Sequence, residues 1–298
     1  MTRSADATPN AAGLRRDAAR ERRLLLGLSA PALALVSVTM VLPVGWLFWL
    51  SLFGEDGQLG LENYRRLIEQ PSYGRILLAT FEISALTTAI CAVLGYLLAY
   101  LLAQLSPRSA GVLMIGVLMP FWTSILVRTY AWLVLLQRDG LINAWGMQLG
   151  LWRQPLALAY SLTGTVIGLV HIMLPFLVLP LYGSMRAIDR DCLKAAASLG
   201  ANPVTAFWRV YFPLSQPGLF AGAVIVFILS LGAFVTPAVL GGGKVIMAAN
   251  AVASDVELFF DWGPASALGV VLLVLTALLL GVAARLVRLD RVFGGHGS

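Results

Sequence analysis

The chain has 298 residues, of which 59% are hydrophobic and 12% are charged, and its mean hydropathy is +0.83. Charged residues make up about a quarter of an ordinary soluble domain, so this composition excludes a soluble globular protein and predicts one integral membrane domain. The net charge of +6 does not indicate a nucleic-acid-binding protein, because the arginines cluster beside apolar segments and form no basic patch with interleaved aromatic residues.

Six apolar stretches are long enough to cross a membrane, which takes about 20 residues. They lie at 24–52, 75–105, 110–137, 161–182, 219–240 and 262–287. We expect Pro175 and Pro180 to break the fourth of them. Residues 1–23 and 288–298 are predicted to be terminal tails, and 24–287 the membrane domain. The expected fold class is therefore all-α, a polytopic membrane protein with six transmembrane helices.

The segments between the spans carry the remaining local signals. A polar stretch at 55–73 contains GLENYRRLIE and predicts a short interfacial helix, and residues 138–160 and 241–261 form the other external segments.

Most arginines and lysines fall on one side if both termini, the turn at 106–108 and the segment 189–218 share that side. The positive-inside rule then places both termini in the cytoplasm. Cys91 and Cys192 are expected to be free thiols.

The segment 189–218 is the longest interior stretch that is too polar for a membrane, and it predicts a helix, a break and a second helix. Asp189 or Asp191 can cap the first helix, and Gly200 can end it in the left-handed conformation. Asn202 followed by Pro203 restarts a helix as N-cap and first-turn proline. Pro213 and Pro217 are expected to close the segment before the fifth span.

Within this segment, KAAASLG followed by a proline thirteen residues after Gly200 resembles a known pattern: Glu-Ala-Ala, three residues, glycine, then hydrophobic-x-leucine-proline. That pattern marks the inner-membrane permeases of binding-protein-dependent ABC importers. The resemblance implies a cytoplasmic coupling loop that docks into a groove of an ATPase. The residues that carry it here are Asp191, Lys194, Ala195, Ala196, Leu199, Gly200 and Pro213. Lys194 replaces the family's glutamate. Either the cognate ATPase carries a compensating acid, which is slightly favoured, or Asp191, three residues earlier, supplies the negative charge, and Asp191 can also pair with Lys194 directly.

A second resemblance concerns PFWTSILVRTYAWLVLLQRDGLIN and LGAFVTPAVLGGG, which are similar to segments of the spermidine/putrescine-type permeases. It implies alternating-access import of a small solute, with a polyamine as the favoured substrate. It also implies a second permease subunit of different sequence, two ATPase subunits, an external solute-binding protein and a location in the bacterial inner membrane. The alternatives left open are import of another small organic solute and, less favoured, a stand-alone secondary transporter.

Two charged residues, Glu82 and Arg128, fall inside predicted spans, where charges are rare and costly. Both lie about 10–14 Å from the external ends of their predicted helices. The favoured interpretation is an ion pair that holds the bundle together, and the alternative is that one or both line the solute path. The candidate path residues are Glu82, Trp122, Arg128, Tyr130, Trp132, Phe234, Asp255 and Glu257.

An equally simple explanation exists for most of these candidates, because surface acids are common and tryptophans near a boundary serve as headgroup anchors.

Enzyme signatures are missing from the sequence: it has two histidines, no HExxH motif and no phosphate-binding G-x-x-x-x-G-K-[ST] loop. We therefore predict a protein that is not an enzyme, with no cofactor and no metal, whose ATP hydrolysis takes place on another subunit.

Overall fold

The computed structural model describes residues 11–54 and 57–293, and this part of the chain is helical, with a single isolated β-bridge and no strand. The chain divides into two compact units, Met1–Leu50 and Ser51–Ser298. Five helices are long and apolar enough to cross a membrane, and a sixth span is present if one bent helix pair counts as a span. The all-α polytopic class is therefore confirmed.

The first unit is formed by the helix α1 (Ala11–Ser51) up to Leu50, and the membrane-length part of this helix is Gly27–Ser51. This part agrees with the predicted span at 24–52. Residues 11–23, which were predicted to be a polar tail, continue the same helix, while residues 1–10 lie outside the described part.

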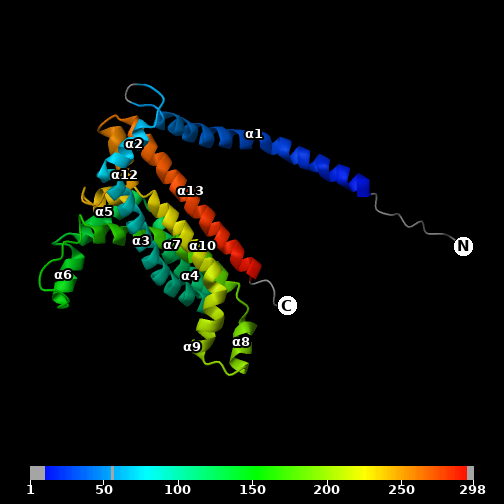
Figure 1. Cartoon of the computed structure of the whole chain (residues 1–298). Coiled ribbons are helices and arrows are strands. Elements are labelled where there is room, and N and C mark those ends of the chain that lie inside the picture. The colour runs from blue at the N-terminus through cyan, green and yellow to red at the C-terminus, as the bar shows by residue number, and fades with distance from the viewer. Residues whose placement is uncertain (1–10, 55–56, 294–298) are drawn as a thin grey trace. The chain divides into compact units, whose positions relative to one another are not determined.

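The second unit holds the remaining helices (Figure 1). They are α2 (Glu62–Glu69), α3 (Pro71–Gln104), α4 (Pro107–Leu118), η1 (Met119–Trp122), α5 (Ile125–Leu136), α6 (Leu141–Gln148), α7 (Leu162–Arg186), α8 (Arg190–Ser198), α9 (Pro203–Ala206), η2 (Phe207–Tyr211), α10 (Phe212–Leu231), α11 (Val235–Leu240), α12 (Ala248–Glu257) and α13 (Trp262–Phe293). The predicted interfacial helix is α2. The predicted second and sixth spans correspond to α3 and α13.

The third predicted span, 110–137, is wrong as a single straight helix. The segments Pro107–Trp122 and Ile125–Gln148 meet at a bend of 99°. Thr123 and Ser124 adopt extended backbone angles, with ψ of 146° and 138°, and this ends the helical hydrogen bonding after the short 3₁₀ turn that contains Pro120. Hydropathy gave no sign of the break, because the residues on both sides of it are equally apolar.

Two expectations about prolines are also wrong. Pro175 and Pro180 lie inside a continuous α7 and do not break it. Pro213 and Pro217 lie inside α10, so the fifth span begins at Pro203 and ends at Leu231 rather than covering 219–240. A five-residue π-helix, η2, precedes Pro213. Proline lacks an N–H for the carbonyl four residues earlier, which accords with a local change of hydrogen-bond register at this point.

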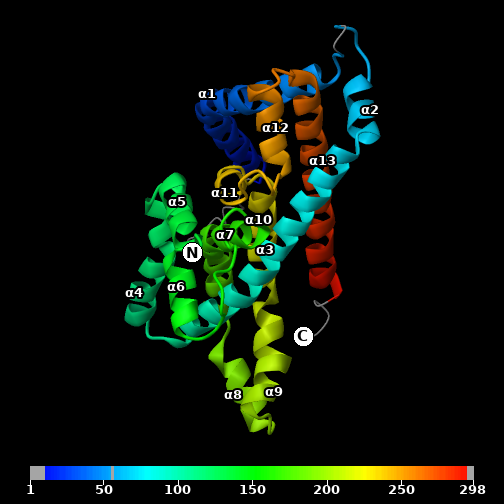
Figure 2. The same cartoon turned by 90° about the vertical axis from the view of Figure 1, so that its left-hand side faces the viewer.

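The core of the second unit is formed by α3, α7 and α10, which pack side by side (Figure 2). Close approach of α7 and α10 depends on Gly218 and Gly222, a small-xxx-small pair of the kind that brings membrane helices together. A Cβ atom on Gly218 would lie 2.4 Å from the Ser184 Cβ atom, and one on Gly222 would lie 2.9 Å from the Leu177 carbonyl oxygen. Only glycine fits at either position.

Short helices form the two ends of this unit. In both views α8 and α9 lie at one end, and α2 and α12 lie at the opposite end (Figures 1 and 2). The predicted coupling loop and the predicted external segments 55–73 and 241–261 are therefore at opposite ends of the helical bundle.

Candidate functional site

The segment 189–218 folds as its local sequence predicts. The Asp189 side chain caps α8 by accepting a hydrogen bond from the Asp191 amide at 2.9 Å. At the other end of α8, the Gly200 amide donates to the Ala197 carbonyl and the Ala201 amide donates to the Ala196 carbonyl, each at 3.0 Å. These two bonds form a Schellman motif, and Gly200 occupies its left-handed position with φ of +83°.

The second helix of the loop begins equally sharply. The Asn202 side chain accepts a hydrogen bond from the Thr205 amide at 2.8 Å, and Pro203 occupies the first turn of α9. Pro213 lies farther along, in the first turn of α10. The helix–break–helix prediction is therefore confirmed, with Asp189 rather than Asp191 as the cap.

The tip of this loop presents small and apolar side chains to the surroundings. Leu199, next to the helix cap, is 89% exposed. Ala195 is exposed and Ala196 is half-buried. The Lys194 Nζ atom lies 2.7 Å from the Asp191 Oδ1 atom, so these two side chains pair directly, and both are well exposed.

A cluster of aromatic rings joins the loop to the membrane helices. The Phe207 ring in η2 contacts Tyr96 and Tyr100 of α3 edge-on, with centroids 6.1 and 5.5 Å apart. The Tyr100 ring also contacts Tyr211 at 5.4 Å. Leu193 of α8 packs on the same core. Packed side chains therefore connect the loop to α3 and α10.

Glu82 and Arg128 do not form the predicted ion pair in the described part of the chain. Each lines a different cavity. Glu82 is exposed and lies in a cavity of about 830 Å³ between α3, the start of α7 and residues 244–246, together with Arg75 and Lys244. The pair assumed that the helix carrying Arg128 packs along α3, whereas α5 packs against α7 and α11 after the bend that precedes it.

Arg128 lies in the first turn of α5 and lines a smaller cavity of about 410 Å³. Apart from Thr236, the other lining residues are apolar, and they come from η1, α5, α7, α10, α11 and the turn before α11, with three phenyl rings from Phe121, Phe176 and Phe234. The Arg128 Nε atom is buried and has no hydrogen-bond partner. Phe234, a predicted path residue, is thus brought together with Arg128.

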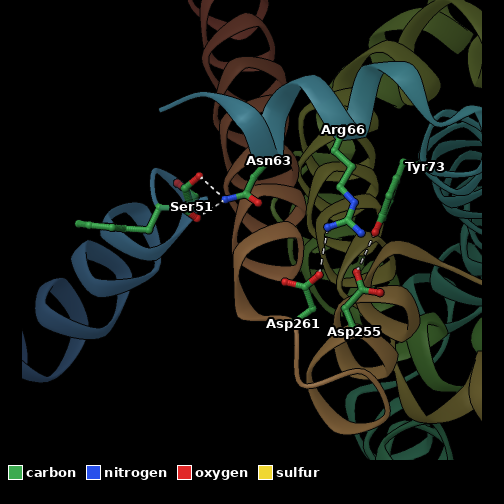
Figure 3. Close-up of polar contacts among 7 residues, drawn as sticks. Ser51, Asn63, Arg66, Tyr73, Asp255 and Asp261 are labelled. Atoms are coloured by element: carbon green, nitrogen blue, oxygen red, sulfur yellow. Dashed lines mark hydrogen bonds and ion pairs between the residues drawn. The ribbon is translucent and has the colours of Figure 1, made fainter. Parts of the chain in front are cut away.

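Asp255 and Asp261 form a polar clasp with α2 and α3 (Figure 3). The Arg66 guanidinium lies 3.2 Å from the Asp261 carboxylate, and the Tyr73 hydroxyl donates to the Asp255 carboxylate at 3.3 Å. Burial raises the pKa of Asp255 above its usual range, and the Tyr73 hydrogen bond partly opposes this rise. Asp255 therefore serves α2 and α3 as a structural partner in this conformation.

A buried asparagine completes the clasp. The Asn63 side chain donates to the carbonyls of Ser51 and Phe53, at 3.1 and 2.7 Å (Figure 3). Gly263 leaves room for it, because a Cβ atom there would lie 2.7 Å from the Asn63 Oδ1 atom. Sequence reasoning missed this clasp, since its partners are separated by up to 195 residues and nothing local connects them.

The other predicted path residues lie apart from one another. Trp122 and Tyr130 are exposed, and so is Glu257. The Trp132 indole donates to His171 Nδ1 at 3.1 Å, which fixes both side chains between α5 and α7. Among the described residues, no group of three or more His, Cys, Asp or Glu side chains has the arrangement of a metal site.

A bundle of membrane-length helices with a rigid, capped loop at one end and a polar clasp at the other defines a polytopic membrane transport subunit. The chain belongs to the family described as binding-protein-dependent transport system inner membrane component, whose model matches residues 93–289. It is a multi-pass inner-membrane protein and the permease subunit of an ABC importer, and it is not an enzyme, since ATP hydrolysis belongs to a separate subunit.

The comparisons with individual proteins agree with this assignment. The chain is 35% identical over 225 residues to the spermidine/putrescine transport system permease protein PotB of Haemophilus influenzae, covering 76% of this chain and 78% of that protein. Its fold is similar to a chain of a bacterial ABC transporter involved in the import of the acidic polysaccharide alginate, with a TM-score of 0.74, 15% identity and coverage of 92% and 98%.

A second alginate transporter structure contains a periplasmic protein bound to an alginate pentasaccharide, and its matching chain has a TM-score of 0.73, 14% identity and coverage of 94% and 98%. At these identities the structures show the fold alone. Family membership and this fold indicate that the chain works within an assembly of permease and ATPase subunits served by a binding protein.

Proposed function

We propose that this chain is one permease of a polyamine importer and carries spermidine or putrescine into the cytoplasm by alternating access. The observation that supports the substrate class is the 35% identity to a spermidine/putrescine permease over three quarters of the chain. The partners we propose are a second permease of different sequence, two ATPase subunits and an external solute-binding protein.

The loop at 189–218 is proposed as the ATPase-docking element, with both chain termini on the same, cytoplasmic side. Support comes from the exposure of Leu199 beside two rigid caps, because an apolar side chain held this far from its own core is suited to burial by another protein. The Schellman motif at Gly200 keeps α8 and α9 in a fixed angle, so the loop can transmit force as one body. The aromatic rings around Phe207 then pass its displacement to α3.

Glu82 is proposed to line the solute path. It is exposed on this chain although it lies in a membrane-length helix, and a carboxylate in that position does not face lipid. A path formed with the second permease gives it a polar environment, and a polyamine ammonium gives it a counter-ion. Arg75 and Lys244 line the same cavity, and their positive charges would balance the negative charge of Glu82 when no solute is present.

Solute-stimulated ATP hydrolysis by the reconstituted complex tests the substrate class. The permease is assembled in proteoliposomes with its partner permease, ATPase and binding protein from the same organism. The solutes compared are putrescine, spermidine, a neutral sugar and molybdate. Stimulation by the two polyamines supports the proposal, and stimulation by another solute alone contradicts the substrate while leaving the importer class intact.

A further inference from the structure

The cavity beside α5 has a chemistry that a polyamine does not suit. Its single charged side chain is Arg128, and no aspartate or glutamate is among the described residues that line it. The Arg128 Nε atom is buried without a partner, so the guanidinium keeps an unused donor inside an apolar cavity. An uncompensated charge in such a place is costly and favours a bound oxyanion.

The other side chains that line the cavity favour a ligand in which a hydrocarbon group is attached to that oxyanion. Phe121, Phe176 and Phe234 present their rings to the cavity, together with aliphatic side chains of α7 and α10. The Phe121 and Phe176 rings contact one another edge-on, with centroids 4.9 Å apart. A volume of about 410 Å³ is within the range of ordinary small-molecule sites.

The cavity is also open on the surface of this chain. Phe121, Ile125, Leu229 and Phe234 are all exposed at its rim. With the predicted orientation, α4 and η1 rise roughly 24 Å from the cytoplasmic turn, against a hydrocarbon thickness of about 30 Å. The break before α5 therefore lies in the outer part of the bilayer, within reach of the outer headgroups.

We propose that the cavity formed by Arg128 and the three phenylalanines binds an anionic amphiphile, with a carboxylate or phosphate group on the guanidinium and an acyl chain along the rings. The source of this chemistry is an acidic phospholipid of the outer leaflet or a free fatty acid. The cavity shares no lining residue with the cavity that contains Glu82, and the proposal does not depend on the identity of the imported solute.

The test measures equilibrium binding to the complete transporter, purified in an uncharged detergent and stripped of lipid. The probes are dioctanoyl phosphatidylglycerol, decanoate, dioctanoyl phosphatidylcholine, dodecyltrimethylammonium and inorganic phosphate. We expect one or both anionic amphiphiles to bind at least tenfold more tightly than phosphatidylcholine and the cationic amphiphile. Binding of phosphatidylglycerol alone identifies a phospholipid site, and binding of decanoate alone identifies a carboxylate site.

Three variants connect the binding to the cavity. Arg128→Gln should weaken it about 10–100-fold, the effect of losing hydrogen bonds to a charged group. The matched control Arg138→Gln removes an exposed arginine outside the cavity and should change nothing. Leu229→Glu places a carboxylate at the rim while keeping Arg128, and it should also abolish binding of the anionic amphiphile, which keeps the test valid if Arg128→Gln does not fold.

Three results would overturn the proposal. Equal affinity of the wild type and both cavity variants would show that the amphiphile binds elsewhere. Equal affinity of phosphatidylglycerol and phosphatidylcholine would show that charge plays no part. Equal affinity of inorganic phosphate and the amphiphiles would show a simple ion site with no role for the rings.

Discussion

Replacing Gly218 by alanine tests whether the contact between α7 and α10 holds the bundle together. The new Cβ atom would lie 2.4 Å from the Ser184 Cβ atom and 2.9 Å from the Pro180 carbonyl oxygen. Ordinary contacts begin at about 3.4 Å, so the two helices must separate or deform, and overpacking of this kind costs about 1–3 kcal/mol. Gly183→Ala on α7 is the matched control, because nothing lies within 4 Å of its Cβ position.

Both variants gain the same helix propensity on exchange of glycine for alanine, so this gain cancels between them. Gly218→Ala should therefore be less stable than Gly183→Ala by about 1–3 kcal/mol. Thermal unfolding of the detergent-solubilised permease, followed by tryptophan fluorescence, measures the difference as several degrees in Tm. Equal Tm values, or a more stable Gly218→Ala, would refute close packing of these helices.

Three further predictions concern the coupling loop, the clasp and the intramembrane charges. Gly200→Val should lower the free energy of unfolding by about 1–3 kcal/mol, because valine is strained at this left-handed position, and should reduce co-purification of the ATPase. Gly200→Asn should preserve both the stability and the co-purification, since asparagine tolerates this conformation. Equal behaviour of the two variants would argue against the cap. Burial raises the pKa of Asp255, so its contribution to folding stability is present at low pH and is lost as the pH rises through that raised pKa. An asparagine side chain does not ionise, so the Tm advantage of Asp255→Asn over the wild type should grow between about pH 4 and pH 7.5. An advantage that shrinks over this range would contradict the sign of the pKa shift. The effects of Glu82→Gln and Arg128→Gln on stability should add within about 0.5 kcal/mol in a double-mutant cycle, because the two residues line different cavities. A larger coupling energy would show that the two side chains form an ion pair.

Local rules were sufficient to predict the coupling loop. The caps at Asp189, Gly200 and Asn202 depend on residues within five positions of one another, and each formed as the local sequence requires. The number and approximate place of the long apolar helices followed from hydropathy for the same reason, since burial in lipid depends on composition along a single segment.

Features that depend on distant contacts were not predictable. The clasp between Arg66 and Asp261 joins residues 195 positions apart, so no periodicity or spacing announces it. The bend at Thr123 and Ser124 is invisible to hydropathy, and so is the packing of α5 on α7 and α11 rather than on the helix that carries Glu82. The prolines of α7 lie within a continuous helix because packing by its neighbours, rather than local preference, decides its course.

Uptake of labelled putrescine into proteoliposomes that contain the complete importer tests the account most directly. We predict uptake that requires ATP inside the vesicles and the binding protein outside them, and that falls sharply when Leu199→Asp introduces a charge at the exposed tip of the loop. Uptake that continues without ATP, or that depends on an ion gradient instead, would contradict the account, because a stand-alone transporter needs no loop of this kind.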